Sequence, residues 1–451
     1  MKQKTYEMDM CNGPLLKKIL IFTIPVMLSG ILQLLFNAAD IIVVGRYAGK
    51  ESLAAVGSTT PLINLIINLF VGLSVGANVA VAKYYGADKE RDVKETVHTA
   101  MLTAAVCGII LVIVGILLTK PMLVLMDSPK GVIDKSAVYL KIYFLGMPAM
   151  MIYNFGSAIL RAVGDTKRPL YFLITAGVIN VCFNLIFVIV CDMGVTGVGI
   201  ATVISQYISA GLIIRCLIKE NGAYRLNLSE LKITKAKFKE ILAVGIPAGM
   251  QGVVFALSNV LIQSSINSFG SVVIAGNTAA GNIEGFIYIS MNAYNQSAIS
   301  FTSQNLGGRK YERISRVLLI CTAIVTVVGA VLGCGAYVLG ERLLHIYSSD
   351  ASVIHYGIVR MKVICLTYFL CGIMDVFAGS VRGLGYSFVP MVISTIGACV
   401  LRIIWIFTVF KAHHTLETLY VSYPITWMIT IFAYIVCYII CLKKVKRRLM
   451  V

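Results

Sequence analysis

Residues 19–44 read ILIFTIPVMLSGILQLLFNAADIIVV, a long apolar run in which Asp40 is the single charged side chain. The hydrocarbon core of a bilayer is about 30 Å thick, and a helix needs about 20 apolar residues to cross it. Lys17 and Lys18 lead into the run, which lacks the small-residue cleavage site of a signal peptide. We therefore predict that this run remains in the protein as its first transmembrane helix.

Similar runs recur along the 451 residues, of which 58% are hydrophobic and 13% are charged. An average soluble domain is about 25% charged, so this composition excludes a water-soluble fold. The formal net charge of +18 comes from short basic clusters between the apolar runs. Such clusters mark membrane topology, and we expect the lipid bilayer, not nucleic acid, as the partner.

The sequence carries none of the motifs that mark a soluble enzyme site. It has no GxxxxGK[ST] phosphate loop, no GxSxG elbow and no HExxH metal motif. Its twelve cysteines form no CxxC pair and no zinc-binding spacing with histidine. We expect no enzyme activity, no organic cofactor and no structural metal, so any transport must draw on an ion gradient or on the gradient of the substrate.

Hydropathy predicts an all-α integral membrane protein with twelve transmembrane helices in two pseudo-symmetric bundles of six. Most of the 39 lysine and arginine residues fall in loops on the side of the two termini. By the positive-inside rule both termini are cytoplasmic, and we expect a multi-pass protein of the plasma (inner) membrane of a prokaryote. The predicted spans are residues 19–44, 53–80, 96–119, 136–159, 169–191, 195–218, 241–267, 273–302, 316–339, 353–380, 389–410 and 419–442.

The two halves are related by an internal repeat. Shifting the chain by 222 residues aligns Pro25 with Pro247 and Asn37 with Asn259, and a shift of 221 aligns Pro169 with Pro390. The polar stretch 219–240 is expected to be a cytoplasmic linker between an N-terminal lobe (1–218) and a C-terminal lobe (241–451). Because each lobe has six spans, the copies share one orientation, and a cavity is expected between them.

Asp40 is the first candidate site residue, because a carboxylate at membrane depth costs about 2.5 to 3.5 kcal/mol or more without partners or water. Asn37 and Gln33 precede it at helical spacing, so the three side chains share one face. That face could bind a proton or a sodium ion. The alternative is that Asp40 lies near the outer interface and contacts water only.

Span five carries Asn180 and Asn184 one turn apart, and span six carries Thr202. Their side-chain oxygens suit a hard cation or a proton network and could complete a site with Asp40. The alternative is that these residues only join helices through hydrogen bonds, which is a common role of asparagine and threonine in membranes.

The second half carries its own buried acids. Asp375 lies in the middle of span ten, at the repeat position of Asn154, and is expected to titrate or to hold a cation. Glu284 begins a polar stripe with Tyr288 and Asn292 on span eight, which is typical of a helix that lines a cavity. The alternatives are a carboxylate paired with a neighbouring helix for Asp375, and a Glu284 that extends to the interface.

Several ordered motifs resemble one transporter family. They are IP near the start of each half, NAADIIVVGR (37–46), KYYGADKER (83–91), ILRAVGDTKRP (159–169) and SVRGLG (380–385). In this order they are similar to the multidrug and toxic compound extrusion (MATE) family over essentially the whole chain. The resemblance implies two six-helix lobes around a central cavity that opens to either side in turn. It also implies export of drugs or metabolites, in particular organic cations, in exchange for Na⁺ or H⁺.

The resemblance also assigns roles to residues. Asp40 matches the first-helix aspartate of the N-terminal lobe, and Asn180 and Thr202 are similar to its partners. Asn184 stands where some members carry an acid. Asp375 matches an aspartate that some branches use for cation binding, whereas Phe255 stands near the place of the span-seven acid. We assign Gln33, Asn154, Gln251, Glu284, Tyr288 and Asn292 to the substrate cavity.

A monomeric antiporter is the leading interpretation, and a lipid-linked oligosaccharide flippase of the wider superfamily is the alternative. A flippase would be expected to have extra spans and a cavity rich in lysine and arginine. Here basic residues are nearly absent from the predicted spans, apart from Arg402 and a few near helix ends. A membrane-embedded enzyme or a channel fits less well, because no nucleophile or metal cluster lies at depth and channels are more often built from repeated subunits.

Overall fold

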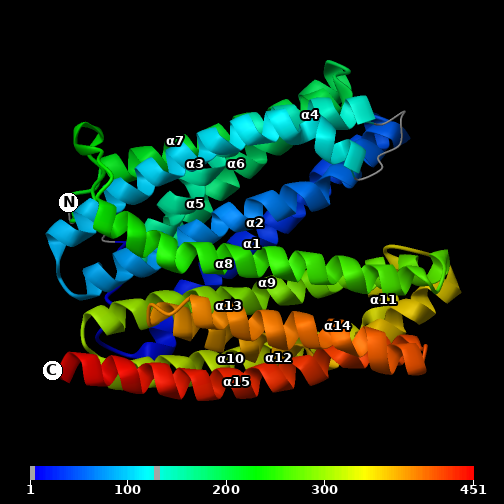
Figure 1. The fold of residues 1–451 in the computed structure, drawn as a ribbon. Helices are drawn as coiled ribbons and strands as arrows, with labels where there is room; N and C mark the ends of the chain where they lie inside the picture. The colour runs from blue at the N-terminus through cyan, green and yellow to red at the C-terminus, as the bar shows by residue number, and fades with distance from the viewer. Residues whose placement is uncertain (1–5, 126–132, 451) are drawn as a thin grey trace. The chain divides into compact units, whose positions relative to one another are not determined.

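The computed structural model describes residues 6–125 and 133–450, and within these ranges every regular element is helical (Figure 1). The chain divides into two compact units, unit 1 (Met1–Asp9 and Leu28–Gly249) and unit 2 (Met10–Met27 and Met250–Val451). Two long helices therefore begin in one unit and continue in the other. Their crossing points, after residues 27 and 249, are 222 residues apart, the same spacing as in the sequence repeat.

Long helices carry most of the first half of the chain. They are long because the apolar runs are rarely interrupted and because a helix satisfies all its backbone groups within the bilayer. The elements are α1 (Leu15–Tyr47), α2 (Lys50–Gly86), α3 (Glu90–Leu125), α4 (Ile133–Leu145), α5 (Met147–Ala162), α6 (Lys167–Leu185), the π-helical turn η1 (Ile186–Val190), α7 (Gly194–Ile218) and the 3-10 turn η2 (Leu228–Glu230).

In the second half, α12 is the central helix of unit 2 and packs against α9, α10 and α15 (Figure 1). The elements are α8 (Lys235–Asn267), α9 (Ser271–Gly307), α10 (Tyr311–Val338), α11 (Gly340–His345), α12 (Ala351–Gly383), α13 (Phe388–Ser394), the π-helical segment η3 (Thr395–Val400), α14 (Leu401–Trp405), the π-helical segment η4 (Ile406–Phe410) and α15 (Leu416–Met450).

The helices agree with the predicted spans one for one. Ten described helices are long and apolar enough to cross a membrane, and α4 with α5 forms an eleventh span that is bent by 45°. The twelfth predicted span, 273–302, lies within α9, which is long enough to cross but too polar to count among these helices. A polar helix in this position is covered by its neighbours, since most of its side chains from Ser290 to Asn305 are buried.

Two kinds of irregularity interrupt the spans. Gly146 and Pro148 lie at the bend between α4 and α5, because proline lacks the N–H that would continue the helix. The π-helical segments η1, η3 and η4 interrupt spans five and eleven, and such segments are frequent at functional sites.

The repeated R-x-x-G motif ends a helix in both halves. Gly164 and Gly385 have φ values of 93° and 88°, in the left-handed region that favours glycine. Each donates its N–H to the carbonyl of the motif arginine, Gly164 to Arg161 at 3.0 Å and Gly385 to Arg382 at 2.8 Å. In both halves the next residue bonds back across five residues, which completes a Schellman cap. The motif thus serves helix termination.

Candidate functional site: a buried polar chain in unit 1

Asp40 and Asn184 meet in unit 1, although 144 residues separate them in the sequence. The side-chain amide of Asn184, on α6, donates a hydrogen bond to Asp40 Oδ1, on α1. Close packing of α1 on α6 allows this contact, since Gly177 leaves space for the ring of Phe36. No lysine or arginine forms an ion pair with Asp40 among the described residues. A neutral amide therefore holds the carboxylate.

The polar chain continues from Asn184 across two helices. The Asn184 amide also donates to Asn180 Oδ1 at 3.2 Å, and Asn180 Nδ2 reaches Thr202 Oγ1, on α7, at 3.5 Å. Asn180 and Asn184 are 4% and 1% exposed, and Asn184 Oδ1 is buried without a hydrogen-bond partner. A buried, unused amide oxygen next to a carboxylate is a suitable ligand for a hard cation.

Other predicted members of this site lie elsewhere. Asn37 and Gln33 are exposed and form no part of the buried chain. Two tyrosines that the sequence analysis did not single out, Tyr139 and Tyr143 of α4, lie close enough to Asp40 for its charge to act on their phenol groups. Their position depends on the bend between α4 and α5, which the sequence signals only through Gly146 and Pro148.

Unit 2 holds Asp375 in a different environment. The Asp375 side chain is 8% exposed, and the described part of the chain offers it no hydrogen bond. Tyr288 of α9 and Arg382 of α12 lie within range of its charge, and Asn292 interacts with Tyr288. The structure thus brings Asp375, Tyr288 and Asn292 of the predicted set together.

Glu284 is paired with an arginine that the sequence analysis missed. Arg360 of α12 donates Nε to Glu284 Oε1 at 2.8 Å and a terminal nitrogen to Glu284 Oε2 at 2.6 Å. Its other terminal nitrogen donates to Asn277 Oδ1 at 2.5 Å, and its guanidinium lies 5.7 Å from the ring centre of Tyr420. Glu284 is 4% exposed, so it is a buried, paired carboxylate and does not extend to the interface.

Arg402 is a second buried arginine in unit 2. It is 2% exposed, donates to Thr426 Oγ1 at 3.1 Å and lies 4.0 Å from the ring centre of Tyr423. Its Nε has no hydrogen-bond partner. Among the described residues it has no carboxylate within ion-pair distance. Arg402 is therefore a fixed positive charge, stabilised by an aromatic face instead of an acid.

The last two members of the predicted set are held by structural hydrogen bonds. Gln251 accepts a hydrogen bond from Arg382 and donates to Ser394 Oγ at 3.0 Å, and Ser394 in turn contacts Tyr434 at 2.6 Å. This chain joins α8, α12, α13 and α15 in the interior of unit 2. Asn154 donates to the Met150 carbonyl of its own helix at 2.9 Å.

The geometry defines an integral membrane protein with buried, uncatalytic polar sites. Among the described residues no group of three or more His, Cys, Asp or Glu side chains could hold a metal ion. The MatE family model matches residues 25–186 and again residues 247–408. These matches cover most of the chain, so the chain belongs to the multidrug and toxic compound extrusion (MATE) family of efflux transporters and is not an enzyme.

Named relatives and solved structures agree with this assignment. The chain is 26% identical over 381 residues to the probable multidrug resistance protein YoeA of Bacillus subtilis (strain 168), covering 83% of this chain and 82% of that protein. It is 27% identical over 398 residues to the probable multidrug resistance protein YpnP of the same organism, covering 87% and 88%.

A solved outward-facing structure of a multidrug resistance MATE family transporter of the MOP superfamily has the same fold. It superposes with a TM-score of 0.92 at 20% identity and covers 99% of this chain and 100% of that chain. At this identity the likeness shows the fold alone. The fold prediction of twelve helices in two related halves is thereby confirmed.

Proposed function

We propose that this protein exports drugs or metabolites, in particular organic cations, in exchange for Na⁺ or H⁺ by alternating access. The observation that carries the proposal is the buried chain of Asp40, Asn184, Asn180 and Thr202. The relatives YoeA and YpnP are named as probable multidrug resistance proteins, which supports drugs as substrates. The protein works as a monomer in the plasma membrane, with both termini in the cytoplasm.

The coupling ion binds at Asp40 because that carboxylate has no fixed positive partner. A buried carboxylate needs a neutralising charge, and a sodium ion or a proton supplies it. The oxygens of Asn180, Asn184 and Thr202 complete a set of hard donors, and Asn184 Oδ1 is free to turn toward a bound cation. Asn37, on the same helix, stands at the exposed approach to this site.

The repeat supports placement of the ion in the N-terminal lobe. The two family matches end at residues 186 and 408, so Asn180 corresponds to Arg402. Each of these residues hydrogen-bonds a threonine on the following span, Thr202 and Thr426. A 222-residue shift also aligns Asp40 with the buried Ile262. The C-terminal copy has therefore lost the acid and gained a positive charge, which repels a cation.

Within unit 2, Arg360 and Arg402 take the place of a mobile cation, and the polar stripe of α9 is left for substrate. Asp375 with Tyr288 and Asn292 forms an acidic and aromatic wall that suits an organic cation. We assign residues 1–218 and 241–451 to the two lobes, with 219–240 as their linker.

The buried arginines Arg360, Arg382 and Arg402 are the observation that favours the second candidate, a flippase for a lipid-linked oligosaccharide. A guanidinium binds phosphate groups well, and a pyrophosphate-linked lipid would require such residues. Two of the three already have protein partners, Glu284 for Arg360 and Gln251 for Arg382, which favours the antiporter.

The test uses purified protein in liposomes loaded with a fluorescent cationic dye. Sodium and proton gradients are imposed separately and together, and dye movement is followed over time. The antiporter proposal predicts movement that requires one of these gradients and stops when it is collapsed. Dye that never moves under any gradient, together with scrambling of a labelled polyprenyl-phosphate lipid, would replace this proposal with the flippase.

A further inference from the structure

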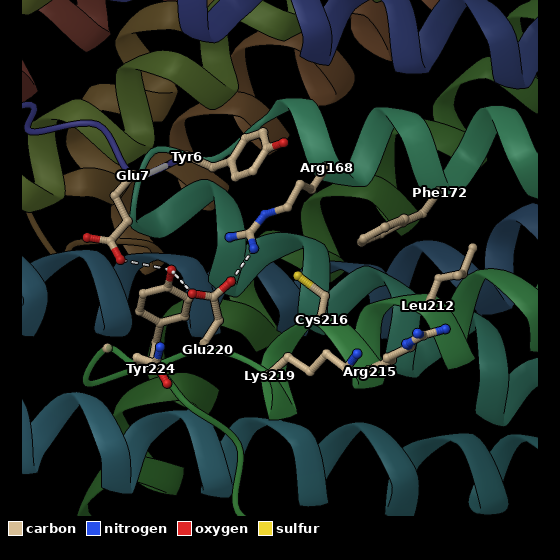
Figure 2. A pocket seen from close by; sticks show the side chains of 12 residues that line it. Tyr6, Glu7, Arg168, Phe172, Leu212, Arg215, Cys216, Lys219, Glu220 and Tyr224 are labelled. Carbon is tan, nitrogen blue, oxygen red and sulfur yellow. Dashed lines mark hydrogen bonds and ion pairs between the residues drawn. The ribbon is translucent and has the colours of Figure 1, made fainter. Parts of the chain in front are cut away.

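A cavity of about 510 Å³ opens between the ends of α6 and α7 in unit 1 (Figure 2). Arg168 and Phe172 of α6 line one side, at a spacing of four residues. Leu212, Arg215, Cys216 and Lys219 line the other side, at spacings of three and four on one face of α7. The walls thus combine apolar side chains toward the membrane with basic side chains toward the helix ends.

The acidic residues of this cavity are already in use. Arg168 forms ion pairs with both Asp165 and Glu220. Tyr224 donates to Glu7 Oε1 and to Glu220 Oε2, at 2.9 Å in both cases, and Figure 2 shows these contacts on one wall. Burial, followed by the charges of Glu7 and Glu220, raises the pKa of Tyr224, so its phenol stays a donor. This network forms a neutral, fixed wall.

Two positive charges remain without a counter-charge. Arg215 and Lys219, one turn apart at the end of α7, are exposed and have no carboxylate within ion-pair distance in residues 6–125 and 133–450. The loop that follows them is on the side predicted to be cytoplasmic, where anionic lipid headgroups lie. A phosphate between these side chains would receive charge-assisted hydrogen bonds from both.

The neighbouring surface faces hydrocarbon. Tyr171 and Val178 of α6 are 51% and 54% exposed, and Tyr207 of α7 is 50% exposed. A soluble protein would not leave such a surface bare beside a basic cavity, whereas a lipid matches both parts. We propose that this cavity binds an anionic phospholipid, with its phosphodiester between Arg215 and Lys219 and an acyl chain along Phe172 and Leu212.

The test measures binding of phosphatidylglycerol to delipidated full-length protein in detergent, by native mass spectrometry and by titrated thermal stability. R215Q/K219Q is the test variant. K235Q/K239Q is its control, because Lys235 and Lys239 are also exposed, four residues apart, at the end of another helix of unit 1. R215K/K219R keeps both charges and shows whether charge alone suffices. Inorganic phosphate and phosphatidylcholine are run as separate ligands.

We expect phosphatidylglycerol to bind R215Q/K219Q about thirty-fold more weakly than wild type, since each basic residue near a membrane surface adds a similar increment. Binding to K235Q/K239Q and to R215K/K219R should match wild type. Equal binding to R215Q/K219Q and wild type, or an equal loss in K235Q/K239Q, would overturn the proposal. Saturation of the same response by inorganic phosphate would overturn the lipid as the ligand, as would equal binding of phosphatidylcholine.

Discussion

The Asn184 amide donates its N–H to the Asp40 carboxylate, and the oxygen of the same amide is buried without a partner. One side chain therefore holds the acid and keeps an unused ligand beside it. An arginine in place of Asn184 would neutralise Asp40 permanently, as Arg360 neutralises Glu284 in unit 2. The difference between these two acids is the basis of the predictions on coupling and stability.

The first prediction concerns the identity of residue 184. In Asn184→Asp two carboxylates lie within hydrogen-bond distance and hold one proton between them. We expect the pH midpoint of dye export in liposomes to move to higher pH, while the protein still folds. Asn184→Ala is the control, because it removes the amide without adding an acid. A pH profile of Asn184→Asp that coincides with that of wild type would contradict the geometry proposed for this site.

The ion pair of Glu284 with Arg360 is expected to stabilise the fold of unit 2. Arg360→Met leaves the buried Glu284 unpaired, which costs about 3 to 5 kcal/mol, and the double variant E284Q/R360M should recover most of this loss. Thermal unfolding in detergent measures both. Arg91→Met removes an exposed pair with Glu95 and should change stability by at most about 0.5 kcal/mol. Comparable losses in Arg360→Met and Arg91→Met would show that burial of the pair is unimportant.

Close backbone packing of α2 on the first part of α8 predicts a glycine effect. A Cβ on Gly72 would lie 2.2 Å from the backbone nitrogen of Gly249, and backbone cannot move aside as a side chain can. Gly72→Ala should therefore lower the free energy of unfolding by about 1 to 3 kcal/mol. Gly281→Ala, where a Cβ would meet open space, is the matched control and should be neutral or stabilising. Thermal midpoints measured side by side decide the point.

The linker offers a pH prediction outside the membrane. The Lys94 ammonium lies 2.5 Å from Glu230, and its hydrogen bond, followed by that of Asn227, lowers the pKa of Glu230 below the ordinary 4.5. A lowered pKa means that the contribution to stability is present above the ordinary value and is lost as the pH falls through the lowered one. Hydrogen exchange of residues 227–234 should therefore speed up in acid in wild type. Glu230→Gln should exchange at a rate that does not depend on this titration.

Most of the fold was predictable because transmembrane helices are written as local apolar runs. The twelve runs gave the helices, and the repeat at 222 residues anticipated the two family matches. The bend at Gly146 and the π-helical segments around Arg402 were not predicted. They depend on which helix packs against which, and hydropathy carries no such information.

The candidate site was predictable only in part, for the same reason. Asp40, Asn180, Asn184 and Thr202 are polar residues in apolar runs, and each could be selected from its desolvation cost. The contact of Glu284 with Arg360 joins residues 76 positions apart on two helices, and no local pattern indicates it. Asn37 and Gln33 share the helix of Asp40 but remain exposed, because a helical face is wider than a site.

The central claim is that the coupling ion binds at Asp40, in the N-terminal lobe. The most direct measurement compares gradient-driven dye export in liposomes by wild type, Asp40→Asn and Asp375→Asn, each at matched protein content. The account predicts that Asp40→Asn no longer responds to the sodium or the proton gradient, whereas Asp375→Asn keeps its ion dependence and loses apparent affinity for the dye. Export by Asp40→Asn that still follows the ion gradient, with coupling lost in Asp375→Asn instead, would contradict it.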